Sequence, residues 1–319
     1  MSLHKVAISE QDYSSGVIRL PYHGRLGNNL FQYCFGRVLS EELQCGLLAS
    51  PIDGFAHIKS THMTLESNVY ERKISIKQEK MQGKLLVKEN NKVLHICFAE
   101  LLNFLKIGNG KKLIEIEYGF FVYVPFYKNY FNQIRYQWLQ LPDKYNLEEN
   151  DLTIHIRSGD IWQENTTEGP HDSYCGLPFS FYQTIIEQRN WQKIYIVTED
   201  PEDPMVCKLV YSYGASIVSR TAIEDFNFIK SSKNIVLAVS TFSWFAAFLS
   251  QARKIYYPLA GIFHQEIRPD LNLLVNEERY HYQQVYPDGQ FKDSFQGIFF
   301  AGQPLWTGTN EVRQFLLCN

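Results

Sequence analysis

The sequence of 319 residues lacks several features that would define its class at once. Its six cysteines include no CxxC pair and no zinc-ligand spacing, so we expect reduced thiols and a cytoplasmic protein. Residues 1–16 contain no apolar run like that of a signal peptide. The net charge of −3 leaves no broad basic face for a phosphate backbone, so we expect no nucleic-acid partner.

Long hydrophobic runs are also absent. The most apolar stretch, residues 235–249 (IVLAVSTFSWFAAFL), is shorter than the roughly 20 residues that a membrane span needs. Its middle carries Ser240, Thr241 and Ser243. The stretch therefore predicts a buried strand that leads into a buried helix, and no transmembrane segment.

The most informative stretch that is present is LTIHIRSGD, residues 152–160. Apolar and polar residues alternate in it, which predicts a strand that ends at Ser158-Gly159-Asp160. His155 and Arg157 should then project from one face near its carboxyl end, roughly 7 Å apart, where open α/β sheets bind ligands. An imidazole and a guanidinium there suit a base edge and a phosphate of a nucleotide. The alternative is a strand whose His and Arg meet only solvent or a carboxylate.

A second motif lies near the amino terminus. Residues 16–20 predict a strand, residues 21–29 (PYHGRLGNN) a glycine-containing loop, and residues 30–43 a helix. Glycines allow backbone N–H groups to approach an anion, and the start of a helix adds unpaired donors. The motif has neither the GK[ST] ending of a P-loop nor the third glycine of a dinucleotide fingerprint, so by itself it favours a structural turn.

The second half of the chain alternates strands and helices, which predicts a doubly wound parallel sheet. The expected strands are 152–157, 193–198, 215–219, 234–239 and 254–257, and the expected helices are 178–190, 203–213, 222–231 and 242–252. The first half is less regular. We expect a strand at 45–49, helices and loops over 51–110, and an aromatic helix after Pro125 that packs against the first domain.

The polar, turn-rich residues 142–151 predict a domain boundary. We expect a Rossmann-like amino-terminal domain at 1–145, a second Rossmann-like domain at 146–265, and a tail at 266–319 that packs back on the core. We expect the tail to be irregular, with a last helix near 311–317. Two such domains would face each other across a cleft. The glycine loop would lie on one side of it, and His155, Arg157 and the helix start at residues 241–243 would lie on the other.

Four segments of the chain resemble the bacterial α-1,2-fucosyltransferases, glycosyltransferase family eleven, or the wider fucosyltransferase superfamily. GRLGNNLFQY (24–33) is similar to that family's GGLGNQLFQY, and STFSWFAAFL (240–249) is similar to its SSFSWWGAWL. HIRSGD (155–160) resembles the HxRRxD motif of the wider fucosyltransferase superfamily, and the aromatic stretch 123–135 resembles the segment before the interdomain boundary. The resemblance implies an α/β fold of the GT-B-like type and inverting transfer from GDP-β-L-fucose to a glycan, without a metal ion or other cofactor.

The resemblance also implies roles for individual residues. Arg157 and Asn28 would be catalytic, at the β-phosphate of the leaving GDP and near the fucose. The remaining residues would contact the donor. His155 would lie at the guanosine, Asp225 would accept from the guanine N–H groups, and the helix start would bind the phosphates. The implied donor-binding residues are Arg25, Gly27, His155, Asp225, Thr241, Phe242 and Ser243.

The chain departs from the family pattern at three positions. Ser158 replaces the second Arg of HxRRxD, Asn29 follows Gly27-Asn28 in place of Gln, and Phe245 replaces the second Trp. Losing a guanidinium bears on the donor and the rate more than on the fold, and Arg25 could supply part of that charge. The alternatives are a transferase that uses another GDP-sugar and a non-catalytic nucleotide- or glycan-binding protein of the same fold.

The base that accepts the proton of the incoming hydroxyl has no sequence signature. Asp160 and His171 are candidates because they lie in or beside the loop after the key strand, although a turn role suits Asp160 better and an acceptor contact suits His171 better. The chain has no Asp-x-Asp sequence, which fits a site in which arginines replace a metal ion.

Overall fold

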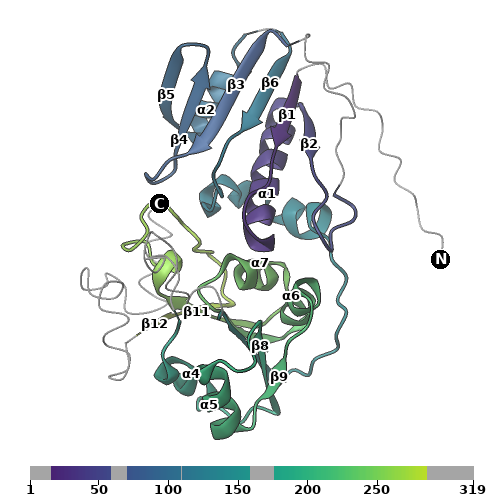
Figure 1. The fold of residues 1–319 in the computed structure, drawn as a ribbon, viewed down its shortest axis with the longest axis vertical. Helices are drawn as coiled ribbons and strands as arrows, with labels where there is room; N and C mark the ends of the chain where they lie inside the picture. The colour runs from purple at the N-terminus through teal and green to yellow at the C-terminus, as the bar shows by residue number, and fades with distance from the viewer. Residues whose placement is uncertain (1–15, 59–69, 109, 159–175, 286–319) are drawn as a thin grey trace, which may run out of the picture.

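The computed structural model describes residues 16–58, 70–108, 110–158 and 176–285. Within these ranges the chain is an α/β protein with two six-stranded, mostly parallel sheets and helices packed on them (Figure 1). We call them the amino-terminal sheet (β1 to β6) and the carboxy-terminal sheet (β7 to β12). No helix among these residues is long and apolar enough to cross a bilayer.

The amino-terminal sheet has the strand order β2-β1-β6-β3-β4-β5. Its first four strands are parallel, and β3, β4 and β5 form an antiparallel meander. The strands are β1 (Gly16–Leu20), β2 (Gly46–Ala49), β3 (Arg72–Gln78), β4 (Lys84–Glu89), β5 (Lys92–Cys97) and β6 (Lys112–Ile116). Helices α1 (Leu26–Leu43) and α2 (Phe98–Lys106) pack on it.

Only one face of the meander is covered. Ile74, Ile76 and Val87 are fully or almost fully buried, and they alternate with exposed residues such as Lys73 and Lys77. This period-two pattern is that of a sheet with one solvated face. The expectation of helices and loops over 51–110 is confirmed for α2, but it missed the strands β3 to β5, because their apolar alternation is short and is interrupted by outward lysines.

The carboxy-terminal sheet is parallel throughout and has the order β12-β11-β10-β7-β8-β9. Read from β9, this is the 3-2-1-4-5-6 order of a doubly wound sheet, and the order reverses between β7 and β10. The strands are β7 (Asp151–Ile156), β8 (Lys193–Thr198), β9 (Ser216–Val218), β10 (Asn234–Val236), β11 (Lys254–Leu259) and β12 (Tyr280–Gln284). Its helices are α4 (Phe179–Ile186), α5 (Pro204–Tyr213), α6 (Ala222–Ser231) and α7 (Thr241–Leu249).

Two expectations for this half need correction. The strand expected at 152–157 forms as β7, but it has no exposed polar face, since β7 lies between β10 and β8 and all six of its residues are buried. The tail after residue 265 is not merely irregular, because β12 pairs with β11 and extends the sheet. The expected helix at 311–317 lies outside the described residues.

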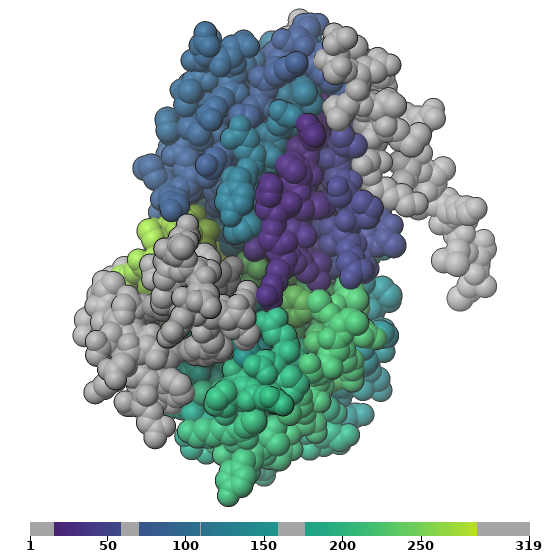
Figure 2. All heavy atoms as spheres, in the orientation of Figure 1, coloured from purple at the N-terminus to yellow at the C-terminus, as the bar shows by residue number. Residues whose placement is uncertain are grey.

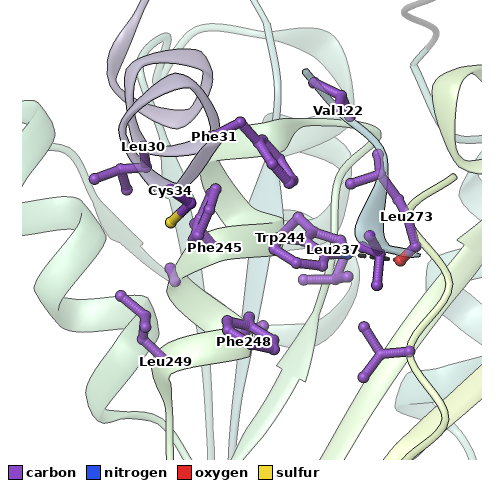
Figure 3. Packing of buried hydrophobic residues seen from close by; sticks show 14 of the residues in the cluster. Leu30, Phe31, Cys34, Val122, Leu237, Trp244, Phe245, Phe248, Leu249 and Leu273 are labelled. Carbon is purple, nitrogen blue, oxygen red and sulfur yellow. Dashed lines mark hydrogen bonds between the residues drawn. The ribbon is translucent and has the colours of Figure 1, made fainter. Parts of the chain in front are cut away.

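The two halves meet through a cluster of aromatic side chains, which we call the aromatic contact (Figure 3). Phe31 of α1 packs against Trp244 and Phe245 of α7, with ring centroids 5.0 and 4.4 Å apart, and Phe248 stacks on Trp244. The Trp244 indole N–H donates to the Leu273 carbonyl at 2.8 Å. All four rings are buried, so this contact is continuous with the cores of both sheets.

Further segments extend the contact, and the space-filling view shows the blue and purple half directly against the green half (Figure 2). The backbone of residues 122–124 pairs with Asn272, whose carbonyl accepts from the Val124 N–H. The aromatic stretch forms short turns, η1 (Val124–Phe126), η2 (Lys128–Tyr130), α3 (Phe131–Gln133) and η3 (Ile134–Trp138), in place of one long helix. It touches both halves, because Arg135 donates to the Phe248 carbonyl and Trp138 lies under Arg37.

Candidate functional site

The starts of helices α1 and α7 touch each other. A Cβ built on Gly27 would lie 2.5 Å from the Phe242 backbone nitrogen, so only glycine allows this approach. Beside it, the Thr241 hydroxyl donates to the Asn28 side-chain oxygen at 3.0 Å. The expectation that residues 21–29 form a loop was partly wrong, because α1 begins at Leu26. Gly27 therefore has a packing role that the sequence did not indicate.

The start of α7 follows β10 directly, at the point where the strand order reverses. Ser240 is the N-cap and its hydroxyl accepts from the Phe242 N–H, while Thr241 is the first helical residue. The Ser243 side chain does not point outward, since its hydroxyl donates to the Ala238 carbonyl at 3.2 Å. Among the three residues expected at the helix start, Thr241 and Phe242 thus reach across to α1 and Ser243 holds the turn.

His155 lies at the end of β7 with its ring against Phe242, at a centroid distance of 5.4 Å. It is buried, and its Nδ1 has no hydrogen-bond partner among the described residues. Burial, together with the charge of Arg157, lowers the pKa of His155 to about 3. The imidazole is therefore neutral at physiological pH and can accept or donate one hydrogen bond to a ligand.

Arg25 and Arg157 come from different halves and approach one carboxylate. Glu199, directly after β8, accepts from Arg25 Nη1 at 2.9 Å, and its other oxygen lies 4.0 Å from Arg157 Nε. The sequence analysis did not single out Glu199. Its position at the end of a parallel strand could have marked it as a candidate site residue. Its pairing with Arg25, 174 positions away, leaves no local sequence pattern.

Ser158, which stands where the superfamily motif has a second Arg, is fully buried. Its hydroxyl donates to the Asp203 carboxylate at 2.6 Å, and Asp203 in turn caps α5 by accepting from the Met205 N–H. This position therefore stabilises the carboxy-terminal half and offers no charge to a ligand.

Asp225 lies in the first turn of α6, next to Phe226, whose ring packs edge-on against Phe242. One carboxylate oxygen accepts from the Arg220 N–H, and the other has no partner among the described residues, as is true of the Asn227 side-chain oxygen. Burial raises the pKa of Asp225 to about 6. A buried carboxylate oxygen without a partner favours a ligand that presents N–H donors.

Three aromatic rings lie beside the start of α1 on the amino-terminal side. Tyr118, just after β6, packs against His23 and Phe120, with centroids 5.2 and 5.7 Å away. Phe120 also approaches Gly24, where a Cβ would lie 3.1 Å from its ring. We call these three side chains the aromatic platform. From the sequence alone, packing is favoured over sugar contact for aromatic residues of this segment such as Tyr118, because aromatic residues are abundant throughout the chain.

A cavity of about 520 Å³ lies at the opposite end of the amino-terminal sheet. Its lining includes Cys45, Lys106 and Lys112, which stand at the starts of β2 and β6 and the end of α2. Because parallel α/β sheets bind ligands at the carboxyl ends of their strands, we do not place the site there.

Asp160 and His171, the candidates for the base, lie outside the described residues. In the part of the chain that is described, no group of three or more His, Cys, Asp or Glu could hold a metal ion. That part brings together Gly27, Asn28, Thr241, Phe242 and His155 directly, and Arg25 and Arg157 through Glu199.

No protein-family model matches the chain. No curated protein matches it either.

Proposed function

We propose that this protein is an inverting glycosyltransferase that moves L-fucose from GDP-β-L-fucose to a glycan hydroxyl without a metal ion. The fold would be of the GT-B-like type, with its donor half on the carboxy-terminal sheet. One observation carries the proposal: two arginines from the two halves converge on one carboxylate next to the switch point between β7 and β10. Open α/β sheets bind nucleotides at such points, and paired guanidinium groups suit a diphosphate.

The arginines would act on the leaving group. As the bond between sugar and phosphate breaks, negative charge grows on the departing diphosphate, so donors fixed there stabilise the transition state more than the ground state. Glu199 supplies the negative charge that Arg25 and Arg157 approach. An incoming diphosphate would compete with that carboxylate for both guanidinium groups.

The nucleoside would lie on the carboxy-terminal side. The neutral imidazole of His155 and the ring of Phe242 would form one wall, and Asp225 would supply a buried carboxylate oxygen. Guanine presents N–H donors on its Watson–Crick edge, which match a carboxylate acceptor better than the edge of adenine does. This match supports a guanosine donor.

Asn28 would lie between the sugar and the phosphate. Its side-chain oxygen accepts from Thr241, which leaves the amide nitrogen as the group that can donate to the ligand. Inversion also requires a base for the acceptor hydroxyl, and Asp160 and His171 stay the predicted candidates. We propose the cytoplasm as the compartment, because Cys34, Cys45, Cys97 and Cys207 are free thiols in the described part.

The first experiment is a thermal-shift comparison of GDP, ADP and UDP. At about a hundred times its dissociation constant a ligand adds roughly 2.7 kcal/mol to the free energy of unfolding, and GDP should give the largest shift. A larger shift with ADP or UDP would contradict the guanosine assignment.

The second experiment measures release of GDP from GDP-fucose by the parent protein and by Arg157→Ala. Removing one donor to the leaving group costs on the order of 3 kcal/mol, or roughly a hundred-fold in rate. Arg253→Ala is the matched control, because Arg253 is an exposed, ion-paired arginine on the same half. Adding EDTA should leave the parent rate unchanged. Equal rates in the parent and Arg157→Ala would remove Arg157 from the mechanism.

A transferase that uses another GDP-sugar is the second candidate, and the burial of Ser158 favours it. A donor site with one fewer guanidinium than the superfamily motif could hold the sugar differently. Comparing GDP-fucose with GDP-mannose in the release assay separates the two, and we expect faster release from GDP-fucose. If GDP binds but neither sugar nucleotide is turned over, a non-catalytic nucleotide-binding protein is the remaining interpretation.

A further inference from the structure

We propose that the aromatic platform, Tyr118 with His23 and Phe120, binds the acceptor by stacking against a pyranose ring. This inference rests on the proposed function and names the substrate class on its acceptor side. The platform stands at the carboxyl end of β6, beside the loop that leads into α1. The start of α1, with Arg25 and Asn28, lies at the same edge of the amino-terminal sheet.

Tyr118 is unusual for a large aromatic residue in contact with other rings. Its exposed fraction is 59%, although its ring packs against both His23 and Phe120. Tyr211 and Tyr136 are also exposed, at 93% and 55%, but the described residues provide neither with an aromatic partner. Single exposed tyrosines are ordinary surface residues, whereas the Tyr118 ring is exposed and is supported by His23 and Phe120, whose rings are tilted 52° and 54° to it.

The platform is held in place before any ligand arrives. The buried Gln32 side chain accepts from the His23 N–H at 3.0 Å and donates to the Gly119 carbonyl at 2.9 Å. One amide thus fixes the loop after β1 to the segment after β6. A surface with its loops already fixed loses little conformational entropy when a ligand binds.

The position of the platform favours an acceptor sugar over the nucleobase. Gly24 separates Phe120 from Asn28, so the platform begins next to the residue proposed to lie near the transferred sugar. The proposed base site, around Phe242 and Asp225, lies across the contact between α1 and α7. A donor with its base there and its diphosphate at Arg25 and Arg157 would place its sugar near Asn28, which leaves the platform beyond Gly24 for the acceptor.

The chemistry of the platform also fits a pyranose. The face of an aromatic ring is electron-rich and attracts the C–H groups that line one face of a sugar ring, while the sugar hydroxyls stay at the edge in water. The phenol of Tyr118 and the imidazole of His23 can exchange hydrogen bonds with those hydroxyls. We therefore expect a neutral glycan here.

The test applies the GDP-saturated protein to an array of immobilised neutral oligosaccharides, followed by titration of the strongest binder in solution. Tyr118→Ala should raise the dissociation constant of that oligosaccharide about ten-fold, and Tyr118→Phe should keep it within about two-fold. Tyr211→Ala is the control and should match the parent. The dissociation constant of GDP should stay unchanged in all three variants.

Several outcomes would overturn the inference. One is that the parent protein binds no oligosaccharide, and another is that the parent and Tyr118→Ala bind the oligosaccharide equally well. A third is weaker GDP binding in Tyr118→Ala, which would place the base on the platform. Failure of the proposed function is distinguishable, because in that case the parent protein does not bind GDP at all.

Discussion

The two halves of the protein meet in two chemically different regions. One is the aromatic contact of Phe31, Trp244, Phe245 and Phe248, where every ring is buried. The other is the polar edge, where Thr241 bonds Asn28 and where Arg25 and Glu199 form an exposed ion pair. The same helix pair, α1 and α7, contributes to both.

The difference shows how one helix pair can serve stability and binding separately. The aromatic contact buries apolar surface, which fixes the two sheets relative to each other. The polar edge contains a buried imidazole nitrogen and a carboxylate oxygen without partners in the described part, which a structure selected for stability alone would avoid. We therefore expect substitutions in the aromatic contact to change the free energy of unfolding and substitutions at the polar edge to change ligand binding.

The largest effect should come from Trp244→Ala. The substitution leaves a cavity between the halves and removes the donor to the Leu273 carbonyl, so the free energy of unfolding should fall by about 3–5 kcal/mol in urea titrations. Trp191→Ala is the matched control, since Trp191 also donates its indole N–H to a carbonyl but is only half-buried, away from the contact. Equal losses for the two variants would contradict a special role for the aromatic contact.

Gly27→Ala should come next. The added methyl group would meet backbone atoms of Thr241 and Phe242, which cannot move aside without separating α1 from α7. Overpacking of this kind costs about 1–3 kcal/mol, and we expect GDP binding to weaken with it. Gly36→Ala in the same helix meets only side-chain atoms of Leu20 and Leu47 and should cost less. If Gly36→Ala is as damaging as Gly27→Ala, the close approach of the helix starts is not the cause.

His155→Gln should change how stability depends on pH. The unfolded chain protonates His155 near pH 6.5, but burial holds its pKa in the folded state at about 3, so its contribution to stability is complete above pH 6.5 and is lost as the pH falls towards 3. Between pH 7 and 5.5 this one group should cost the parent roughly 1.2 kcal/mol, and the variant should lack that loss.

Asp225 acts in the opposite direction, because its raised pKa favours the folded state as the pH falls from about 6 towards 3.8. It is present in both proteins, so the difference between their pH profiles isolates His155. Parallel profiles of unfolding free energy against pH would show that the imidazole is not kept neutral by the fold.

The smallest effect should come from Glu199→Gln. The pair with Arg25 is exposed, so the free energy of unfolding should change by less than about 1 kcal/mol. GDP should bind up to about five-fold more tightly, because the competing carboxylate charge is gone. Glu115→Gln is the control, since it breaks the similarly exposed pair with Arg19 on the open face of the amino-terminal sheet. Tighter GDP binding in both variants would indicate a general charge effect.

Much of the carboxy-terminal sheet could be predicted from the sequence. Strand β8 and helix α6 have the bounds that their periodicity predicted, because strands covered on both faces and helices with caps leave clear local patterns. The meander β3 to β5 was missed, since its apolar alternation is short and interrupted by outward lysines. Strand β12 was missed because an edge strand of mixed polarity, YHYQQ, lacks such a pattern.

The candidate site shows the same division. Asn28, His155 and Thr241 come from segments that were expected to meet, and the structure brings them together. Glu199 and Gln32 could not be found in that way, because each acts by bridging segments that are distant in the sequence. The role of Gly27 was also hidden, since the collision that it avoids is with another helix.

Titration calorimetry of GDP measures whether arginines from both halves hold one diphosphate. We predict that Arg25→Ala and Arg157→Ala each weaken GDP binding by about ten-fold or more, since each loses a charge-assisted hydrogen bond to phosphate, while Arg253→Ala binds like the parent. Unchanged GDP affinity in either Arg25→Ala or Arg157→Ala, or no binding of GDP to the parent protein, would contradict the account.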